Sequence, residues 1–241
     1  MAARPAARPL RHEARAGPGL TATPSPGGAA RFAARFPTVW HVAEAEGMAL
    51  IGAWGLLPAA ELRRRLGAAA SDCNREAFEP LRAPADQGGG VAVLRFQLMR
   101  DARLRPTLHG AYANDPAAWR RHVDAHVFLW PGEVRRDSFL RAVVRARRAE
   151  AVRLGLPPPS PPLVLALDTA GLLRRHGESA WFSRVNVGST LRAGARVRRD
   201  EHTLRPIADY AGGPVAELAV RGPVARDLIG RIAAGHPCPA A

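Results

Sequence analysis

Lysine is absent from the 241 residues, so arginine supplies all 35 basic side chains. With 21 acidic residues, the formal charge at pH 7 is +14, which favours a partner rich in phosphate. Because the chain is also rich in alanine, glycine and proline, part of the arginine content reflects composition, and clustering is more informative than the total. Arginines gather at residues 63–65, 135–148 and 192–199. Two interpretations remain open, a nucleic-acid-binding surface or a solvated basic surface.

Cysteines and long apolar segments are also scarce. Cys73 and Cys238 are too few and too far apart for a disulfide framework or a metal cluster, which suits a reducing cytoplasm. The longest nearly apolar segment, residues 48–60, contains glycine and proline and is too short to span a bilayer. No apolar segment follows the first arginines as it would in a secretory signal. We therefore expect a cytoplasmic protein with no membrane partner and no metal site.

Large apolar residues are almost missing from residues 1–34, which we expect to be a disordered tail because they cannot offset the entropy of ordering. Residues 35–233 are predicted to form a single domain, and residues 234–241 a flexible C-terminal tail. Helices and strands alternate irregularly in the domain, which predicts an α+β fold with a mixed, largely antiparallel sheet flanked by helices. The expected strands are 38–43, 91–96, 127–130, 163–167, 181–187 and 215–220, and the expected helices 44–53, 58–66, 114–124, 133–153, 169–176 and 223–232.

Three of these strands carry a polar side chain on a face that alternation makes otherwise apolar: His41, Arg95 and Glu217. Burying an unpaired charge is costly, so each charged group needs a partner or a solvent-filled cleft. One interpretation is a structural ion pair between Arg95 and Glu217, with His41 as a core imidazole. The other is a cleft lined by all three residues, which suits a charged ligand rich in hydroxyl groups.

Two local motifs have simpler interpretations. His122 and His126 lie one helical turn apart, but no third ligand is evident, so we interpret them as cations near a helix C-terminus rather than as a metal pair. Asp168 follows a strand and precedes a helix, and we predict that it caps that helix.

His41, Arg95 and Glu217 lie in segments that resemble segments of known protein families. Residues 36–44, with Ile51 and Gly55-Leu56-Leu57, resemble the opening of ADP-ribosyltransferase-like domains, where a histidine on the first strand is followed by a short helix and a Gly-Leu turn. The order of further segments is similar to an uncharacterised bacterial family of unknown function, itself distantly similar to DarT-type DNA ADP-ribosyltransferases. Those segments are residues 93–99, 127–130, 164–169, 186–190, 206–210 and 216–220.

The resemblance implies an ADP-ribosyltransferase-like fold with a split sheet, and NAD as a substrate. Glu217 would be the catalytic carboxylate, which stabilises the charge that develops as nicotinamide leaves. Arg95 would be a second catalytic residue that binds the pyrophosphate or orients the acceptor. His41 would hydrogen-bond a ribose or the nicotinamide amide, and Asn186 and Gly188 would border the NAD cleft.

The acceptor of ADP-ribose is left open. Position 215 is valine, whereas arginine-modifying transferases have a glutamate or glutamine two residues before the catalytic glutamate. A nucleobase is slightly preferred because of the basic surface. Two alternatives remain: a catalytically inactive module of the same fold that binds nucleic acid or protein through its arginine-rich face, and another NAD-consuming reaction such as glycohydrolysis or removal of an RNA phosphate.

Overall fold

The computed structural model of the chain describes residues 27–68, 78–85, 89–95, 99–188 and 197–234. Residues 1–26 and 235–241, which belong to the predicted tails, lie outside the described residues. The same is true of both cysteines and of residues 192–196 in the third arginine cluster.

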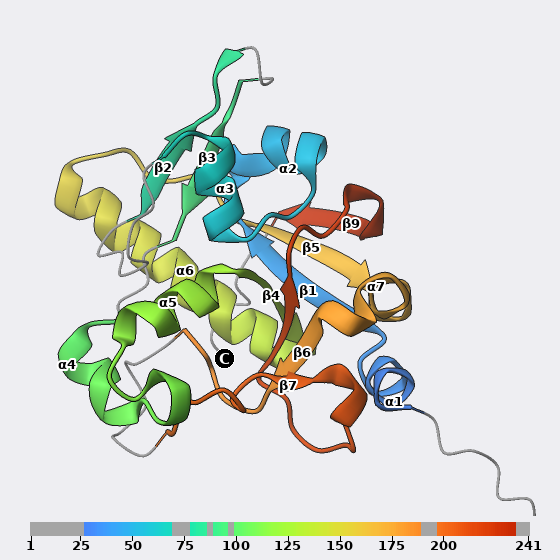
Figure 1. The fold of residues 1–241 in the computed structure, drawn as a ribbon. Helices are drawn as coiled ribbons and strands as arrows, with labels where there is room; N and C mark the ends of the chain where they lie inside the picture. The colour runs from blue at the N-terminus through green and yellow to red at the C-terminus, as the bar shows by residue number, and fades with distance from the viewer. Residues whose placement is uncertain (1–26, 69–77, 86–88, 96–98, 189–196, 235–241) are drawn as a thin grey trace, which may run out of the picture.

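A seven-stranded sheet in the order β7-β6-β8-β4-β1-β5-β9 forms the centre of the fold (Figure 1). Each ladder between neighbouring strands is antiparallel. The predicted α+β class and the largely antiparallel sheet are therefore confirmed. A mixed sheet would contain a parallel ladder as well, and no ladder between the described strands is parallel. The strands of this sheet are β1 (Thr38–Ala43), β4 (His126–Pro131), β5 (Leu163–Asp168), β6 (Ala180–Ser183), β7 (Arg205–Pro206), β8 (Glu217–Arg221) and β9 (Ile229–Ala234).

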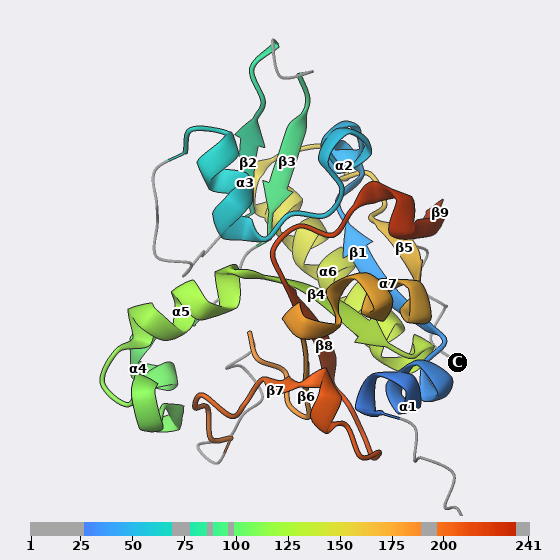
Figure 2. The ribbon, with the colours of Figure 1, turned by 45° about the vertical axis from the view of Figure 1, so that its right-hand side comes forward.

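Helices cover both faces of this sheet. They are α1 (Gly28–Arg35), α2 (Met48–Trp54), α3 (Ala59–Arg65), α4 (Asp101–Leu104), α5 (Pro116–Asp124), α6 (Glu133–Leu154) and α7 (Thr169–His176). Figure 2 shows α7 in front of the sheet and α6 behind it. Phe32 of α1 and Leu172 of α7 belong to one apolar core, and Leu140 of α6 packs against Trp40 and Trp130 in a second core on the opposite face.

Aspartate caps fix the start of two helices where the sequence predicted them. The side chain of Asp115 accepts a hydrogen bond from the backbone N–H of Ala118 at 2.8 Å, and that of Asp168 accepts one from Gly171 at 2.6 Å. Each bond satisfies an N–H group that has no partner inside the helix. The predicted cap at Asp168 is confirmed.

The ladder between β1 and β4 is unusually short. It contains two residue pairs, Val39 with Pro131 and Trp40 with Trp130, whereas β1 pairs with β5 along six residues from Thr38 to Ala43. Beyond Trp40 the edge of β1 that faces β4 is no longer paired in a ladder. The β1–β4 ladder therefore ends one residue before His41.

Strand β3 (Val91–Leu94) lies outside the main sheet. Among the described strands it pairs with β2 (Glu79–Arg82) alone, and this hairpin packs against α2 and α3 through Leu50, Leu81 and Leu94. Strand β3 also ends at Leu94, so Arg95 lies outside the strand predicted at 91–96, and residue 96 is not among the described residues. Strand β6 ends at Ser183, well before the predicted end at residue 187.

Three other sequence predictions are wrong. Helix α1 occupies residues 28–35, inside the predicted disordered tail, because Phe32 is fully buried in the core. Residues 229–234 form β9 along the edge of β5 instead of continuing a helix over 223–232. The third is the amphipathic pattern of the helix expected at 133–153, which predicts that Val134 faces inward; in α6 Val134 is 83% exposed because it precedes the part of the helix that packs on the sheet.

Among the described residues, no helix combines the length and the apolar composition that crossing a bilayer requires.

Candidate functional site

Glu217 begins β8, where that strand pairs with the end of β6 at Ser183. The residue is 4% exposed, and its carboxylate oxygen Oε2 accepts a hydrogen bond from the backbone N–H of Val187 at 2.8 Å. Val187 lies in the segment that follows β6. Two segments about thirty residues apart in the chain therefore hold this carboxyl group in a sheltered position.

Burial and nearby positive charge act in opposite directions on the pKa of Glu217. Burial raises the pKa of Glu217 to about 7, while the hydrogen bond from Val187 and the positive charges of Arg135 and Arg199 act to lower it. The carboxyl group therefore titrates near neutral pH. Carboxyl groups tuned to this range are typical of functional sites, although structural networks also produce them.

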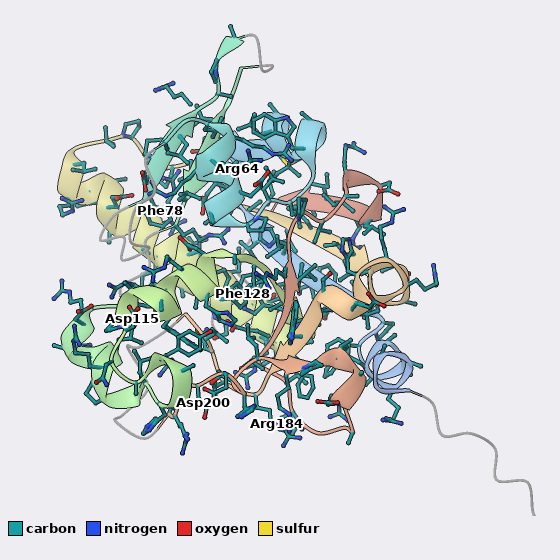
Figure 3. All side chains as sticks on the ribbon, viewed as in Figure 1. Arg64, Phe78, Asp115, Phe128, Arg184 and Asp200 are labelled. Atoms are coloured by element: carbon teal, nitrogen blue, oxygen red, sulfur yellow. The ribbon has the colours of Figure 1, made fainter. Side chains whose placement is uncertain are left out.

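His41 lies where the β1–β4 ladder ends. Its Nδ1 atom is 2.9 Å from the backbone carbonyl oxygen of Phe128, which Figure 3 shows on β4 near the centre of the view. A carbonyl oxygen only accepts hydrogen bonds, so Nδ1 donates and Nε2 of the neutral ring is an acceptor. Burial and the charge of Arg95 lower the pKa of His41 to about 4. The ring is therefore neutral at pH 7 and can accept a hydrogen bond from a ligand hydroxyl.

Arg95 follows β3 and is bonded to the end of β1. Its Nε donates to the carboxylate of Glu44 at 3.1 Å, and its Nη2 donates to the backbone carbonyl of Val42. The guanidinium carbon also lies 5.3 Å from the ring centre of Phe139 on α6. Glu44 is buried and lies 3.4 Å from a second guanidinium, that of Arg147. Arg95 is thus part of an ion-pair network that joins β1, α6 and the β2–β3 hairpin.

The structural ion pair considered between Arg95 and Glu217 is wrong. Within the described part of the chain, the carboxylate paired with Arg95 is that of Glu44. Glu44 follows directly after β1 and presents its carboxylate where the hairpin meets the sheet. The partner of Arg95 is therefore the residue directly after the strand that carries His41, and not a residue of β8.

His41 and Arg95 are brought close enough for the charge of Arg95 to affect the pKa of His41, and Glu217 lies one strand away across β4. Extending the β4–β8 register by one residue places Trp130 opposite Glu217, and the ring centre of Trp130 is 6.1 Å from that of His41. Strand alternation points His41 and Glu217 to opposite faces of the sheet. The two side chains therefore do not share one face of the sheet.

Asn186 and Gly188 flank Val187, the residue whose N–H bonds Glu217. Asn186 is exposed, and its backbone carbonyl accepts a hydrogen bond from Nη2 of Arg199 at 3.4 Å. Both predicted NAD-binding residues are thus chain neighbours of the residue that bonds the Glu217 carboxyl group.

Arg199 is a residue of this site that sequence reasoning did not single out. It is fully buried, and its charge acts on Glu217, whereas the adjacent Arg198 is largely exposed and pairs with Asp200. The two arginines look alike in the sequence. The backbone bridge between Leu108 and Arg199 decides which of them is buried, and no local pattern predicts that long-range pairing.

His122 and His126 lie side by side where α5 meets β4. Their ring centres are 4.9 Å apart, and no group of three or more histidine, cysteine, aspartate or glutamate residues in the described ranges is placed to hold a metal ion. Burial lowers the pKa of both rings, that of His126 to about 4. The interpretation of the pair as cations is therefore wrong, because both pack in an aromatic cluster with Trp119 and Trp181.

Comparison with known proteins gives a family but no activity. No curated protein and no solved structure matches the chain significantly. The model of a family of unknown function, DUF7002, matches residues 37–226. That range includes β1 with His41, the Arg95 network and β8 with Glu217. The chain therefore belongs to the family of unknown function DUF7002.

Proposed function

We propose that the chain is an ADP-ribosyltransferase-like enzyme that binds NAD⁺ and transfers ADP-ribose to an acceptor. In this reaction the bond between nicotinamide and the ribose C1′ breaks, and nicotinamide leaves with the bonding electrons. The acceptor then bonds to C1′ and releases a proton. Positive charge develops on the ribose as nicotinamide leaves, so the reaction needs a fixed carboxylate beside that ribose.

The observation that carries the proposal is the environment of Glu217. Its carboxyl group is sheltered from solvent, and a backbone N–H holds it in one orientation, so little reorganisation is needed when charge develops. The charges of Arg135 and Arg199 favour the ionised form that stabilises an oxocarbenium-like ribose. These properties support Glu217 as the catalytic residue.

His41, Asn186 and Gly188 are the proposed NAD-binding residues. Because Nδ1 of His41 donates to Phe128, Nε2 suits a ribose hydroxyl, which can donate to it. We place the nicotinamide ribose beside His41, where the β1–β4 ladder ends. Asn186 and Gly188 would then border the same ribose on the side of β8.

Arg95 is the proposed residue for the pyrophosphate. A guanidinium can bind two phosphate oxygens side by side, which a lysine cannot do. Its Nε and Nη2 already donate to Glu44 and Val42, so binding the pyrophosphate requires exchange of at least one of these bonds. We expect Arg95→Lys to weaken NAD⁺ binding more than it slows the reaction of bound NAD⁺.

Nicotinamide release tests the proposal. The full chain is incubated with NAD⁺, alone and with single-stranded DNA, duplex DNA, RNA or protein, and nicotinamide is quantified by chromatography. We expect release that Glu217→Gln lowers by at least about a hundredfold, as for loss of a main electrostatic catalyst. Exposed Glu178 offers a matched control, and Glu178→Gln should leave the rate unchanged. The rate should also increase with pH through about 7, because the ionised form of Glu217 is required.

Two results would contradict the proposal. One is the absence of nicotinamide release with every acceptor class, together with no shift of the melting temperature on adding NAD⁺. The other is equal release by the wild-type chain and the Glu217→Gln variant. Product analysis by mass spectrometry then separates transfer of ADP-ribose from simple hydrolysis of NAD⁺.

A further inference from the structure

The three arginine clusters of the sequence differ once their ion pairs are known. In the first, Arg63 is buried and pairs with Glu79, and the side chains of Arg64 and Arg65 both pair with Glu61 on α3, where Figure 3 labels Arg64. All three arginines are thus bound to carboxylates within the fold, although two of them share Glu61. The positive charge available to a partner must therefore come mainly from elsewhere.

The described part of the third cluster is also paired. Arg198 bonds Asp200 at 2.8 Å, and Arg199 is buried next to Glu217. In the second cluster, Arg136 pairs with Asp137, and Arg147 pairs with Glu46 at 2.7 Å. What remains is the outer face of α6.

Three exposed arginines, Arg141, Arg145 and Arg148, form a row along that outer face. Their spacing of four and then three residues puts them on one side of the helix, over about 10 Å of its axis. None of them forms an ion pair with a described residue. The sequence has no acidic residue from Ser138 to Ala149, so the row carries charge of a single sign.

We propose that this arginine row binds the phosphate backbone of a nucleic acid. A row of unneutralised guanidinium groups matches a polymer that repeats a negative charge at short intervals, and each group can bind two phosphate oxygens. A membrane surface fits less well. The exposed residues beside the row, Ser138, Ala142 and Ala149, are too small to insert into a bilayer, and the large exposed apolar side chains of α6, Val134, Val152 and Leu154, lie at the two ends of the helix.

The position of α6 connects this row to the site around Glu217. Arg135, in the first turn of the helix, is close enough to act on the Glu217 carboxyl group. From there α6 runs behind the sheet toward the β2–β3 hairpin in Figure 1, and the arginine row occupies the middle of the helix. If the proposed function holds, on which this step rests, a nucleic acid bound along α6 leads to Glu217 and is the acceptor of ADP-ribose.

Binding is measured by fluorescence anisotropy with a labelled single-stranded DNA of about twenty nucleotides, its duplex form, and an RNA of the same sequence. The triple variant Arg141→Gln/Arg145→Gln/Arg148→Gln removes the row, and glutamine keeps the helix because its helix propensity is similar. The matched control, Arg82→Gln/Arg174→Gln/Arg226→Gln, removes three exposed arginines from other elements. Both variants lower the net charge equally, so only the position of the lost charge differs.

We expect the α6 variant to bind at least about tenfold more weakly than wild type at low salt, and the control to stay within about twofold. The slope of log K against log salt should fall by about two for single strands or about three for a duplex in the α6 variant alone. Equal losses in both variants would overturn the proposal, as would no binding by wild type, or stronger binding to polyglutamate or to anionic vesicles. No NAD⁺ is present and Glu217→Gln should bind like wild type, so failure of the row and failure of the enzyme proposal are distinguishable.

Discussion

Two features of the Glu217 site act in opposite directions on the pKa of its carboxyl group. The carboxyl group is buried, which favours its neutral form, and it lies near Arg135 and Arg199, which favour its ionised form. Burial has the larger effect, so the pKa in the folded chain is about 7, above the ordinary value of 4.5. The folded state therefore binds a proton that the unfolded state has lost between these two pH values.

This difference gives a prediction for stability. As pH rises from 4.5 through about 7, ionising the buried carboxyl group costs the folded state up to about 3 kcal/mol, because each pKa unit corresponds to about 1.4 kcal/mol. Glu217→Gln removes this cost, so the variant should be about as stable as wild type near pH 4.5 and more stable at pH 8. Urea unfolding at both pH values measures the difference. A stability difference that does not change with pH would contradict the assigned burial.

The sequence identified the unusual polar residues but not their partners. His41, Arg95 and Glu217 could be identified because each interrupts an apolar strand pattern. The partner of Arg95 could not be predicted, since Glu44 lies 51 residues earlier and reaches it only after the hairpin docks on β1. The same limit applies to Arg199, which is buried through a bridge to Leu108 rather than through its own local pattern.

At the scale of elements, the sequence predicted correctly those helix and strand limits that neighbouring residues determine. Strand β1 and helix α7 have the predicted limits of residues 38–43 and 169–176. The β-type residues of the strand end at Ala43, and the Asp168 cap starts the helix at Thr169. Strand β9 was predicted as a helix because residues 223–232 contain no strong strand signal. Pairing with the edge of β5 outweighs that weak local preference, as tertiary context often does.

The Gly-Leu-Leu turn after α2 makes one contact that requires glycine. Gly55 has φ +75°, and a Cβ atom there would lie 2.2 Å from the backbone oxygen of Val224. The next residue, Leu56, exchanges two backbone hydrogen bonds with Val224. The turn thus ties the segment after β1 to the segment after β8, the two strands that carry His41 and Glu217.

We predict that Gly55→Ala lowers the free energy of unfolding by about 2–4 kcal/mol, because the strained φ and the clash with Val224 add together. Gly52 is the matched control: it lies in α2, and a Cβ atom there would meet nothing within 4 Å. Gly52→Ala should stabilise the chain by about 1 kcal/mol through helix propensity. Chemical denaturation measures both variants, and equal effects would show that the turn does not need glycine.

For the whole molecule, the number of arginines was less informative than their pairing. The formal charge of +14 suggested a basic surface, yet much of the arginine in the described clusters is bound to carboxylates or buried. The composition counts an arginine in an ion pair and an arginine in solvent alike, so it cannot distinguish these two states. On α6, the exposed Arg141, Arg145 and Arg148 form a row with no ion-pair partner among the described residues.

Buried imidazoles should control how the whole chain responds to acid. The pKa of His126 falls from 6.5 to about 4 because burial in the aromatic cluster disfavours the charged ring. The unfolded chain therefore binds a proton below pH 6.5 that the folded chain does not, and stability is lost as pH falls toward 4. His126 alone accounts for up to about 3 kcal/mol of this loss. Glu217 has the opposite sign between pH 4.5 and 6.5, so wild type shows only the net slope.

His126→Phe should keep the edge-to-face contact with Trp181 while removing the titrating group. We expect its free energy of unfolding to decrease less steeply than that of wild type between pH 6.5 and 4. His202, whose side chain is 83% exposed, provides the control, because replacing it removes a histidine that does not belong to the aromatic cluster. Unfolding by urea at half-unit pH intervals gives the three slopes. If His126→Phe and His202→Gln follow the wild-type slope equally, acid sensitivity originates outside the aromatic cluster.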